Sequence, residues 1–218
     1  MKQGFVKVAS ATPRIRVADP VYNAQVICEQ AKEAAEHGAK IVVFPELCIT
    51  GYTCNDLFLQ ELLLEKAKEA LLTIAEETGQ LETLFLVGLP VDKDGRLYNV
   101  AAVLYRGRIL GMIPKKNIPM YAEFYEGRHF TPGEETVTEY RLGKQVIPFG
   151  SNLLFRCEEL PELILGCELC EDLWVAEPPS TSHALMGATV IANLSASNET
   201  VSKDDYRTLS LIHISEPT

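Results

Sequence analysis

Three reactive side chains of this sequence each follow an apolar segment that is typical of a buried strand: Glu46, Lys115 and Cys170. The segments that precede them are 41–44, 108–113 and 163–167. A rigid sheet directs the side chains at its strand ends into one crevice, which is where α/β folds collect chemistry. We therefore expect a carboxylate, an ammonium and a thiol to face a common site.

The neighbours of Cys170 favour a chemically active thiol over a packed one. Glu168, Glu171 and Asp172 surround it in the sequence, which is a poor setting for an inert apolar side chain. Their negative charge alone would raise the pKa of the thiol, and a nearby cation such as Lys115 would restore its thiolate character. A cysteine and a lysine therefore make chemical sense together here.

Each of these residues also has an ordinary structural interpretation. A glutamate after a proline is commonly a solvated loop residue, and Lys115 with Lys116 could form a surface pair. Cys170 could be a core thiol, since free cysteine packs as a small hydrophobe. A dyad of Cys170 with His183 is conceivable as well, but His183 falls at a helix start rich in Ser and Thr, with no evident residue to orient it.

Cys167 and Cys170 form a single C-x-x-C pattern, which invites a metal or a redox interpretation. A structural zinc site needs a second close pair of ligands, and Cys48 with Cys54 has the wrong spacing. A thioredoxin-like dithiol needs its pair at the start of a helix, whereas Cys167 lies inside an apolar run. We therefore expect Cys167 to be a buried strand thiol, and we expect no metal site.

Alternating helices and strands must hold these residues in place. In the first part of the chain, Asp19 and Pro20 supply the N-cap and first position of a helix that ends at His37-Gly38. Around it, the hydrophobic pattern predicts strands at 5–11 and 41–44 and a second helix at 56–78.

The rest of the chain predicts strands, first joined by hairpin turns at 93–95 and 106–107. These strands are 84–87, 97–105, 108–113, 145–149, 153–157, 163–167 and 189–194, with a short helix at 181–186. The segment 114–132 has no clear period, and such a long irregular stretch in a compact domain is usually functional. The order of elements indicates one α/β domain with a mixed sheet.

The composition is that of a globular chain, with 47% hydrophobic and 23% charged residues among 218. With 30 acidic and 20 basic side chains the net charge is −10, so no excess of Lys and Arg is available to neutralise phosphates. We therefore expect no nucleic-acid partner and no membrane partner. The longest apolar stretch is far short of the roughly 20 residues that span a bilayer, and residues 1–4 do not lead into a signal peptide. A cytoplasmic protein with reduced thiols is the expectation.

Three blocks, in order along the chain, resemble the signature blocks of the nitrilase (carbon–nitrogen hydrolase) superfamily: Phe44-Pro45-Glu46-Leu47, Pro114-Lys115 and Glu168-Leu169-Cys170-Glu171-Asp172-Leu173-Trp174. Within the superfamily, segments 46–52, 56–58, 170–174 and 192–197 closely resemble the glutaminase domain of glutamine-dependent NAD synthetases. The resemblance covers residues 4–207, nearly the whole chain. It implies an α/β fold of the nitrilase-like type, a four-layer α-β-β-α sandwich, here lacking its C-terminal elements.

The resemblance also implies roles for individual residues. Cys170 would be the nucleophile, Glu46 the general base and Lys115 the cation beside the oxyanion. Glu126 matches a second glutamate of the superfamily, within the pattern Glu-x-x-x-Phe-x-Pro that ends at Pro132.

Further positions match residues that hold the glutamine substrate in the family: Tyr121, Glu171, Ser197 and Lys203. Some family members have an arginine at the place of Lys203. A lysine there would attract the substrate carboxylate, but not through two parallel hydrogen bonds.

The implied reaction is hydrolysis of the glutamine amide through a γ-glutamyl thioester, with no metal and no cofactor in this domain. In the family, the ammonia passes to a C-terminal synthetase domain that amidates deamido-NAD with ATP and Mg. This sequence has no glycine-rich pyrophosphate loop of that domain. We expect residues 1–208 to be a carbon–nitrogen hydrolase domain incomplete at its C-terminus, residues 209–218 to be an atypical tail, and the synthetase domain to be absent.

Two other functions stay open from the sequence. One is a free-standing amidase or nitrilase that uses the same three residues on another small amide or nitrile. The other is a non-catalytic interaction module that keeps the fold. The family tends to assemble through its sandwich faces, so a homo-oligomer is also expected.

Overall fold

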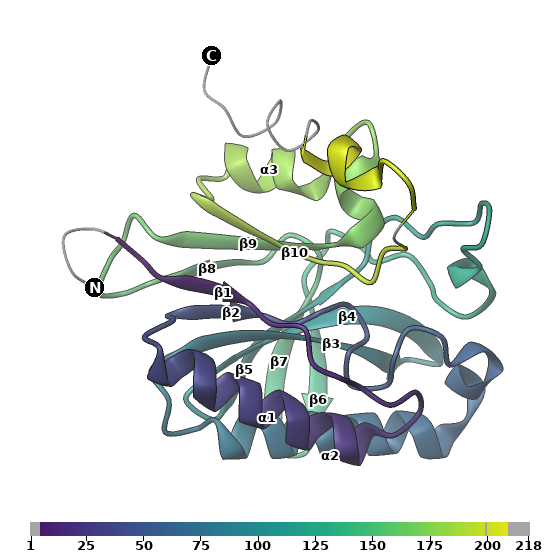
Figure 1. Ribbon diagram of the computed structural model, residues 1–218, viewed down its shortest axis with the longest axis horizontal. Coiled ribbons are helices and arrows are strands. Elements are labelled where there is room, and N and C mark those ends of the chain that lie inside the picture. Colours follow the sequence, from purple (N-terminus) through teal and green to yellow (C-terminus); the bar gives the residue numbers. More distant parts are fainter. Residues whose placement is uncertain (1–4, 199, 209–218) are drawn as a thin grey trace.

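A computed structural model describes residues 5–198 and 200–208, and in it two sheets pack face to face between layers of helices (Figure 1). The first half contains β1 (Val8–Ser10), α1 (Pro20–Glu36), β2 (Ile41–Val43), the 3₁₀ turn η1 (Asn55–Leu59), α2 (Glu61–Glu77), β3 (Leu84–Lys93), β4 (Arg96–Tyr105) and β5 (Arg108–Pro114). The second half contains η2 (Glu126–Arg128), β6 (Thr138–Leu142), β7 (Gln145–Phe149), β8 (Leu154–Arg156), β9 (Ile164–Leu169), η3 (Cys170–Trp174), α3 (Pro179–Leu185) and β10 (Val190–Leu194). Residues 203–208 add a short helix.

The larger sheet has seven strands in the order β1-β2-β3-β4-β5-β7-β6. β1, β2 and β3 are parallel, whereas β3, β4 and β5 form antiparallel hairpins, as the sequence predicts for a mixed sheet. The smaller sheet has the order β10-β9-β8, with β10 parallel and β8 antiparallel to β9. Figure 1 shows α1 and α2 on the outer face of the larger sheet and α3 on the outer face of the smaller one. The predicted α-β-β-α order of layers is confirmed.

Alternation along the strands builds two separate cores. On β3, Phe85 and Val87 pack beneath α1 and α2, in a core that includes Ile27 and Leu71. The residue between them, Leu86, faces the other sheet. The core between the sheets joins it to Ala101, Val103 and Ile113 of the larger sheet and to Leu165, Cys167, Leu169, Ala192 and Leu194 of the smaller one. Cys167 is therefore the buried strand thiol that its apolar neighbours predict.

The prediction of one continuous helix over 56–78 is wrong at its first turn. Gln60 has extended backbone angles, so the segment divides into η1 and α2. Phe58 explains the division, because its side chain is buried and packs edge-on against Phe130 from the loop after β5. A continuous helix would point that ring elsewhere, and the tertiary contact overrides the helical propensity of the sequence.

The strand predictions differ from the structure mainly in length. β3 continues to Lys93 rather than ending at residue 87, and β1 is shorter than the predicted 5–11. β6 was not expected at all; it pairs with β7 at the edge of the larger sheet. Only two of its five residues are buried, so it lacks the apolar run that identifies the central strands. The predicted tail, 209–218, lies outside the described residues.

Candidate active site

Glu46 is held by a turn that directly follows β2 and lies against β3. The turn places Leu47 in the left-handed region with φ of 52°. It packs on Gly88, where a Cβ atom would lie 2.3 Å from the backbone nitrogen of Leu47. Ile49 N–H also donates to the Gly88 carbonyl. Glycine at this position lets the turn approach the strand and directs Glu46 into the interior, where its side chain is 0% exposed.

Lys115 directly follows β5 and is likewise 0% exposed. Its backbone N–H donates to the Asn99 carbonyl of β4, and its own carbonyl accepts from Gly133 N–H. These bonds extend the ladder of β5 by one residue beyond the strand. The lysine side chain therefore starts from a rigid backbone rather than from a free loop.

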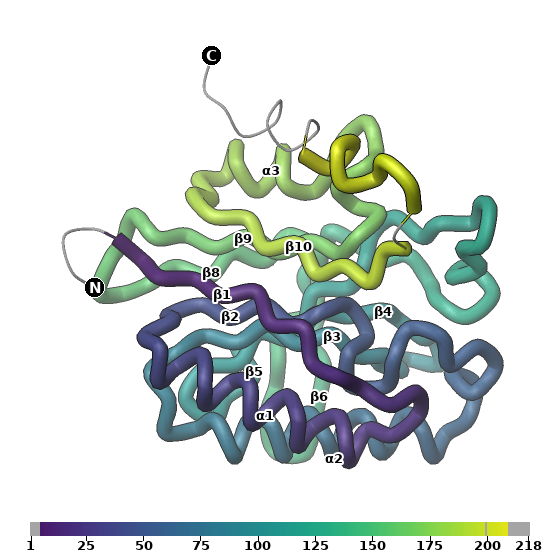
Figure 2. Tube along the Cα trace, viewed as in Figure 1, coloured from purple at the N-terminus to yellow at the C-terminus, as the bar shows by residue number. Residues whose placement is uncertain are grey.

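Cys170 stands where β9 passes into η3, with a left-handed backbone φ of 43° that is unusual for a residue other than glycine. Its side chain is buried. The three residues thus come from two sheets, Glu46 and Lys115 from the larger and Cys170 from the smaller. Figure 2 shows the loop after β5, in teal, extending at the right of the view.

A compact cluster of charges surrounds the Lys115 ammonium. Nζ donates to Oε1 of Glu46 at 2.7 Å and to Oε1 of Glu126 at 2.6 Å. Asn99 lies between the same two carboxylates, with Nδ2 donating at 2.7 Å to Glu46 and at 3.3 Å to Glu126. The Tyr52 hydroxyl donates to Oε1 of Glu126 at 2.7 Å. One cation, one amide and one phenol therefore hold two buried carboxylates.

The second oxygen of Glu46 accepts from the smaller sheet. Ala196 N–H, just beyond β10, donates to Oε2 of Glu46 at 3.1 Å. Ser195, the preceding residue, lowers the pKa of the Cys170 thiol. The segment after β10 therefore acts on both the carboxylate and the thiol.

Burial controls the protonation of the cluster. Loss of hydration raises the pKa of Glu46, although the Lys115 ammonium opposes that effect. Loss of hydration also works against the charge on Lys115, but Glu46 and Glu126 outweigh it and hold the pKa of the ammonium above its ordinary value. Burial, with the charge of Glu46, raises the pKa of Cys170 to about 12, and Lys115 lowers it only in part.

These effects correct one expectation about Cys170. The carboxylates that most strongly raise the pKa of its thiol are Glu46 and Glu126, not the glutamates and aspartate beside it in the sequence. Lys115 acts in the expected direction, but it does not restore a thiolate in the resting protein. The neighbours in sequence are engaged elsewhere: Glu171 accepts from the Tyr121 hydroxyl at 2.8 Å, and Glu168 accepts from Ser180 N–H at 2.9 Å.

The predicted substrate-binding residues form two pairs. Tyr121 bonds to Glu171, and both the Cys170 thiol and Lys115 influence the pKa of the Tyr121 hydroxyl. Lys203 Nζ donates to Ser197 Oγ at 2.7 Å and also contacts Asn198. Ser197 stands two residues beyond Ser195, which lowers the pKa of the Cys170 thiol. Both pairs therefore belong to segments that reach the thiol.

His183 does not join the thiol in the structure. Its ring is buried beneath α3, where Nε2 bonds to the Ser151 carbonyl at 2.9 Å. The Gly166 face of β9 lies directly against this ring, since a Cβ atom there would be 2.8 Å from Nδ1. The histidine thus packs on the opposite face of β9 from Cys167.

Sequence reasoning missed Asn99, Tyr52 and Ala196 as parts of the site. Asn99 could have been identified from the sequence, because it is a polar residue inside the apolar run of β4. Tyr52 lies within a block that resembles the family, but no role was assigned to it. Ala196 contributes only a backbone N–H, which no residue type reveals.

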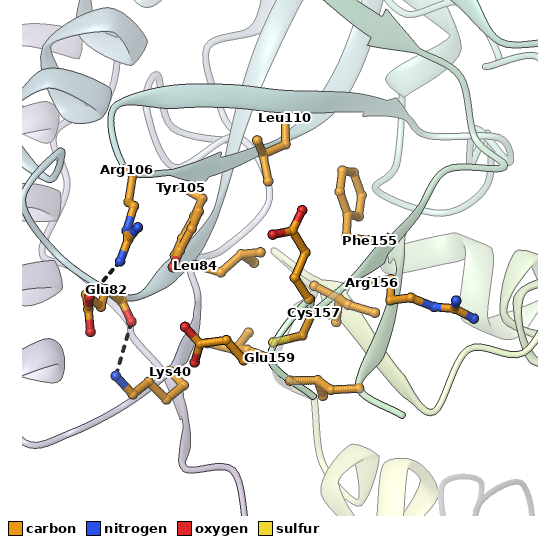
Figure 3. Close-up of a pocket in the computed structure, with 14 residues that line it drawn as sticks. Lys40, Glu82, Leu84, Tyr105, Arg106, Leu110, Phe155, Arg156, Cys157 and Glu159 are labelled. Carbon is orange, nitrogen blue, oxygen red and sulfur yellow. Dashed lines mark hydrogen bonds and ion pairs between the residues drawn. The ribbon is translucent and has the colours of Figure 1, made fainter. Parts of the chain in front are cut away.

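A large cavity lies far from these residues along the strands. It measures about 480 Å³ and opens between the sheets near the beginnings of β2, β3 and β9, whereas Glu46, Lys115 and Cys170 follow strand ends. Figure 3 shows its mixed lining, with Arg106 directed at Glu82 and Lys40 close by. Leu84, Leu110 and Phe155 supply apolar surface. No predicted site residue lines this cavity.

Two features are absent from the described residues, 5–198 and 200–208. No group of three or more His, Cys, Asp or Glu side chains there is arranged to hold a metal ion. No helix in the same part of the chain is long and apolar enough to cross a membrane.

Comparison with known proteins extends these observations. Residues 7–211 match the carbon–nitrogen hydrolase family. The glutamine-dependent NAD(+) synthetase of Mycobacterium tuberculosis is 41% identical over 208 residues, which are 95% of this chain and 31% of that protein. The enzyme of the same name from Thermotoga maritima is 34% identical over 208 residues, 95% of this chain and 32% of that protein. The chain thus spans about a third of the length of these relatives.

Solved structures agree on the fold. A glutamine-dependent NAD(+) synthetase from Cytophaga hutchinsonii superposes with a TM-score of 0.85 and 29% identity, over 95% of this chain and 33% of that one. An amidase from Nesterenkonia sp. superposes with a TM-score of 0.68 and 21% identity, over 91% of this chain and 68% of that one. The second likeness concerns the fold alone.

Proposed function

Because the chain belongs to the carbon–nitrogen hydrolase family, we propose that its buried site hydrolyses the side-chain amide of glutamine to glutamate and ammonia. The observation that carries the proposal is the cluster of Glu46, Lys115 and Cys170, in which a buried ion pair of the first two acts on the pKa of the thiol. The relatives named as glutamine-dependent NAD(+) synthetases support glutamine as the substrate.

In the first half of the reaction, Cys170 attacks the amide carbon of glutamine while Glu46 takes the thiol proton. A neutral thiol of high pKa requires such a base at the moment of attack. The Lys115 ammonium and a backbone N–H following Cys170 stabilise the negative oxygen that forms. Glu46 then gives its proton to the nitrogen, the carbon–nitrogen bond breaks, and ammonia leaves a γ-glutamyl thioester.

In the second half, Glu46 takes a proton from water, which attacks the thioester carbon. The carbon–sulfur bond breaks, the thiol regains its proton, and glutamate is released. Each step moves one proton between Glu46 and a reacting atom, so the cycle needs neither an oxidant nor a metal. Amides are poor electrophiles, and the covalent route divides one difficult step into two easier ones.

Five further residues have supporting roles in this proposal: Glu126, Tyr121, Glu171, Ser197 and Lys203. Glu126 accepts a second hydrogen bond from the Lys115 ammonium, beside the one to Glu46. Tyr121 with Glu171, and Ser197 with Lys203, bind the α-amino and α-carboxylate groups of glutamine, for which a carboxylate and an ammonium are complementary partners.

The relatives also suggest where the ammonia goes. We infer that the chain works in the cytoplasm as the glutaminase part of a glutamine-dependent NAD synthetase. There a synthetase domain outside this chain would use ATP, Mg and deamido-NAD. Transfer of ¹⁵N from the glutamine amide into NAD, in a protein that joins both parts, tests this larger assignment. Assembly into a homo-oligomer stays a prediction.

The glutaminase proposal is tested by release of ammonia from glutamine and by labelling with a diazoketone analogue of glutamine, followed by peptide mapping. We expect the label on Cys170, and we expect Cys170→Ala to lose at least about 10³-fold in kcat. Glu46→Gln should lose about 10²- to 10⁴-fold, the usual contribution of a general base. Cys157→Ala is the matched control, because that thiol lies away from the cluster at the large cavity.

Other outcomes would favour the competing functions. Hydrolysis of simple aliphatic amides without hydrolysis of glutamine would indicate a free-standing amidase. Labelling of Cys170 no faster than that of Cys28 would indicate a non-catalytic module. Either result would overturn the proposal.

A further inference from the structure

Asp172 is a buried carboxylate that the proposed reaction does not use. It lies in η3, two residues beyond Cys170, and is 1% exposed. A carboxylate taken out of water is costly unless hydrogen bonds or a cation compensate it. The structure describes no cation within salt-bridge distance of Asp172, so the compensation comes from N–H donors.

Four N–H donors converge on this carboxylate. Oδ1 accepts from the backbone N–H of Asn117 at 2.7 Å and from its side-chain Nδ2 at 2.9 Å. Oδ2 accepts from the backbone N–H of Leu169 at 3.1 Å and from that of Lys116 at 3.3 Å. Both oxygens are therefore fully occupied, which is the arrangement expected of a buried group that fixes backbone positions.

The donors come from two strand ends in two different sheets. Leu169 is the last residue of β9 and directly precedes Cys170. Lys116 and Asn117 directly follow Lys115, beyond the end of β5. A single side chain thus ties the backbone next to the thiol to the backbone next to the ammonium.

The turn at Cys170 needs such a restraint. Its left-handed φ of 43° is unfavourable for a side chain with a Cβ atom. The bond from Leu169 N–H to Asp172 closes the turn around this residue, as a carboxylate at the third position of a helical turn does when it accepts from the residue before the turn. Of the four bonds to Asp172, this is the one that spans the strained residue itself.

We propose that Asp172 is a positioning residue that holds the Cys170 thiol in register with the Lys115 ammonium across the two sheets. The inference rests on the proposed glutaminase function for its kinetic consequence. Asp172 acts through geometry rather than through its charge, because the carboxylates that act most strongly on the thiol are Glu46 and Glu126. It does not touch the reacting atoms and is not a catalytic residue.

The test compares Asp172→Asn with Glu135→Gln. The amide introduced by Asp172→Asn would keep the shape of the side chain but turn an NH₂ group toward N–H donors, so two of the four bonds are lost. Glu135 is the matched control, because it is an exposed carboxylate that contacts Lys116 through the side chain rather than the backbone.

We expect Asp172→Asn to lower kcat about 10²-fold, the effect of displacing a reacting group by about 1 Å, with KM changed less than threefold. We also expect slower alkylation of Cys170 by the diazoketone analogue at every pH, and faster amide hydrogen exchange at Leu169, Lys116 and Asn117. Glu135→Gln should resemble the wild type in all three measurements. If Asp172 had only a structural role, Asp172→Asn would lower the free energy of unfolding without lowering kcat selectively relative to KM.

Asn117→Ala provides a second, milder variant if Asp172→Asn does not fold. It removes only the side-chain donor and keeps the three backbone donors. We expect a three- to tenfold loss of kcat and a matching loss of alkylation rate. Unchanged values in both measurements would overturn the proposal, as would Asp172→Asn values equal to those of Glu135→Gln.

Failure of the proposed function gives a different result. A wild-type protein that hydrolyses no glutamine would remove the kinetic readout and the glutaminase assignment. Hydrogen exchange and alkylation of Cys170 by iodoacetamide would still decide the role of Asp172, since neither measurement needs turnover.

Discussion

Lys115 carries one positive charge between two carboxylates, with none of its surface exposed. The cluster of Lys115, Glu46 and Glu126 therefore has excess negative charge when all three groups are ionised. Burial is the main reason why the thiol of Cys170 keeps its proton in the resting protein, and that excess charge adds to it. In the proposed mechanism, the proton therefore moves to Glu46 as the sulfur attacks, rather than beforehand.

The alkylation rate of Cys170 by iodoacetamide should report this charge balance. In the wild type we expect the rate to rise steadily with pH and to show no plateau below pH 9, because the pKa of the thiol lies at about 12. Glu46→Gln removes a charge that raises this pKa, so alkylation at a given pH should be faster. Lys115→Met removes the charge that lowers it, so alkylation should be slower.

Mass spectrometry of the Cys170 peptide across a pH series gives these rates. Alkylation of Cys28 in the same samples serves as an internal control, since burial is the main cause of its raised pKa. Shifts of the two variants in the same direction would contradict the electrostatic account.

Asn99 is the residue whose loss should disturb both carboxylates together. Its Nδ2 donates to Glu46 and to Glu126, and its backbone carbonyl accepts from Lys115 N–H. Asn99→Ala keeps the backbone bond but leaves two buried acceptors short of a donor. We expect a loss of about 1–3 kcal/mol in the free energy of unfolding and at least a tenfold loss of kcat.

Urea unfolding and the ammonia-release assay measure the two effects of Asn99→Ala. Asn99→Asp is the informative comparison, because it keeps the shape but adds a third buried carboxylate to the cluster. It should be less stable than Asn99→Ala. Equal stability of the two variants would show that the amide donor, and not the charge balance, dominates.

The residues of the candidate site could be proposed from the sequence where the residue type itself is a reactive group. Glu46, Lys115 and Cys170 are reactive groups after apolar strands, and the family resemblance added Glu126, Tyr121, Glu171, Ser197 and Lys203. Asn99 and Asp172 were not identified as supports, because an amide or a carboxylate can bond to backbone groups anywhere in the fold. Only the tertiary structure brings Lys116 and Asn117 to Asp172.

At the scale of elements, the turn after β2 depends on the missing side chain of Gly88. The nearest atoms to a Cβ there belong to the backbone of Leu47, Pro45 and Glu46, at 2.3, 2.6 and 2.8 Å. Backbone atoms cannot rotate away as the end of a flexible side chain can. The turn that carries Glu46 must move if any larger residue occupies position 88.

Gly88→Ala should therefore displace Glu46 even though it adds a single carbon. We expect a loss of at least about 2 kcal/mol in the free energy of unfolding, as for overpacked cores, together with loss of the proposed glutaminase activity. Gly95→Ala is the control: its Cβ meets nothing within 4 Å, so it carries only the strain of a positive φ. A Gly88→Ala protein with wild-type kcat would refute this account of the turn.

The break between η1 and α2 shows why the boundaries of elements could not be predicted from the sequence. The leucines and alanines of 56–78 have a continuous helical period, and nothing local forbids Gln60 from continuing the helix. Phe58 decides the outcome by packing on Phe130, more than 70 residues away along the chain. β6 was not predicted for a related reason: the sequence of an edge strand that is mostly exposed resembles that of a polar loop.

At the scale of the whole molecule, the sandwich joins two sheets through one apolar layer. Periodicity predicts helices, strands and a mixed sheet. It does not predict that the strands divide into sheets of seven and three, because pairing between distant strands leaves no local pattern. The four layers came from the family resemblance, and the structure confirms them.

Buried thiols should make this fold sensitive to alkaline pH. Burial raises the pKa of Cys28 to about 11 and that of Cys48 and Cys170 to about 12, from 9.0 for an exposed thiol. Between these values the unfolded chain has released protons that the folded chain still holds. Because stability falls with pH wherever the folded state binds more protons, the thiols contribute fully below pH 9 and progressively less as pH rises toward 12.

Urea unfolding at a series of pH values from 7 to 11 measures this slope. We expect the free energy of unfolding to fall with pH above 9, and we expect the fall to be shallower in a Cys28→Ala, Cys48→Ala double variant. The slope is compared rather than the absolute stability, because the substitutions also leave small cavities. An unchanged slope would assign alkaline unfolding to other groups.

The bond between Ala196 N–H and Glu46 joins residues that are 150 positions apart. At ordinary rates of translation, about 5–20 residues per second, Glu46 is synthesised roughly 8–30 s before Ala196. During that interval, Oε2 of Glu46 lacks the backbone N–H of Ala196 that donates to it in the folded protein. A chain arrested before Leu194 should therefore be catalytically silent, although Cys170 has already been synthesised, because the donor to the second oxygen of Glu46 is missing.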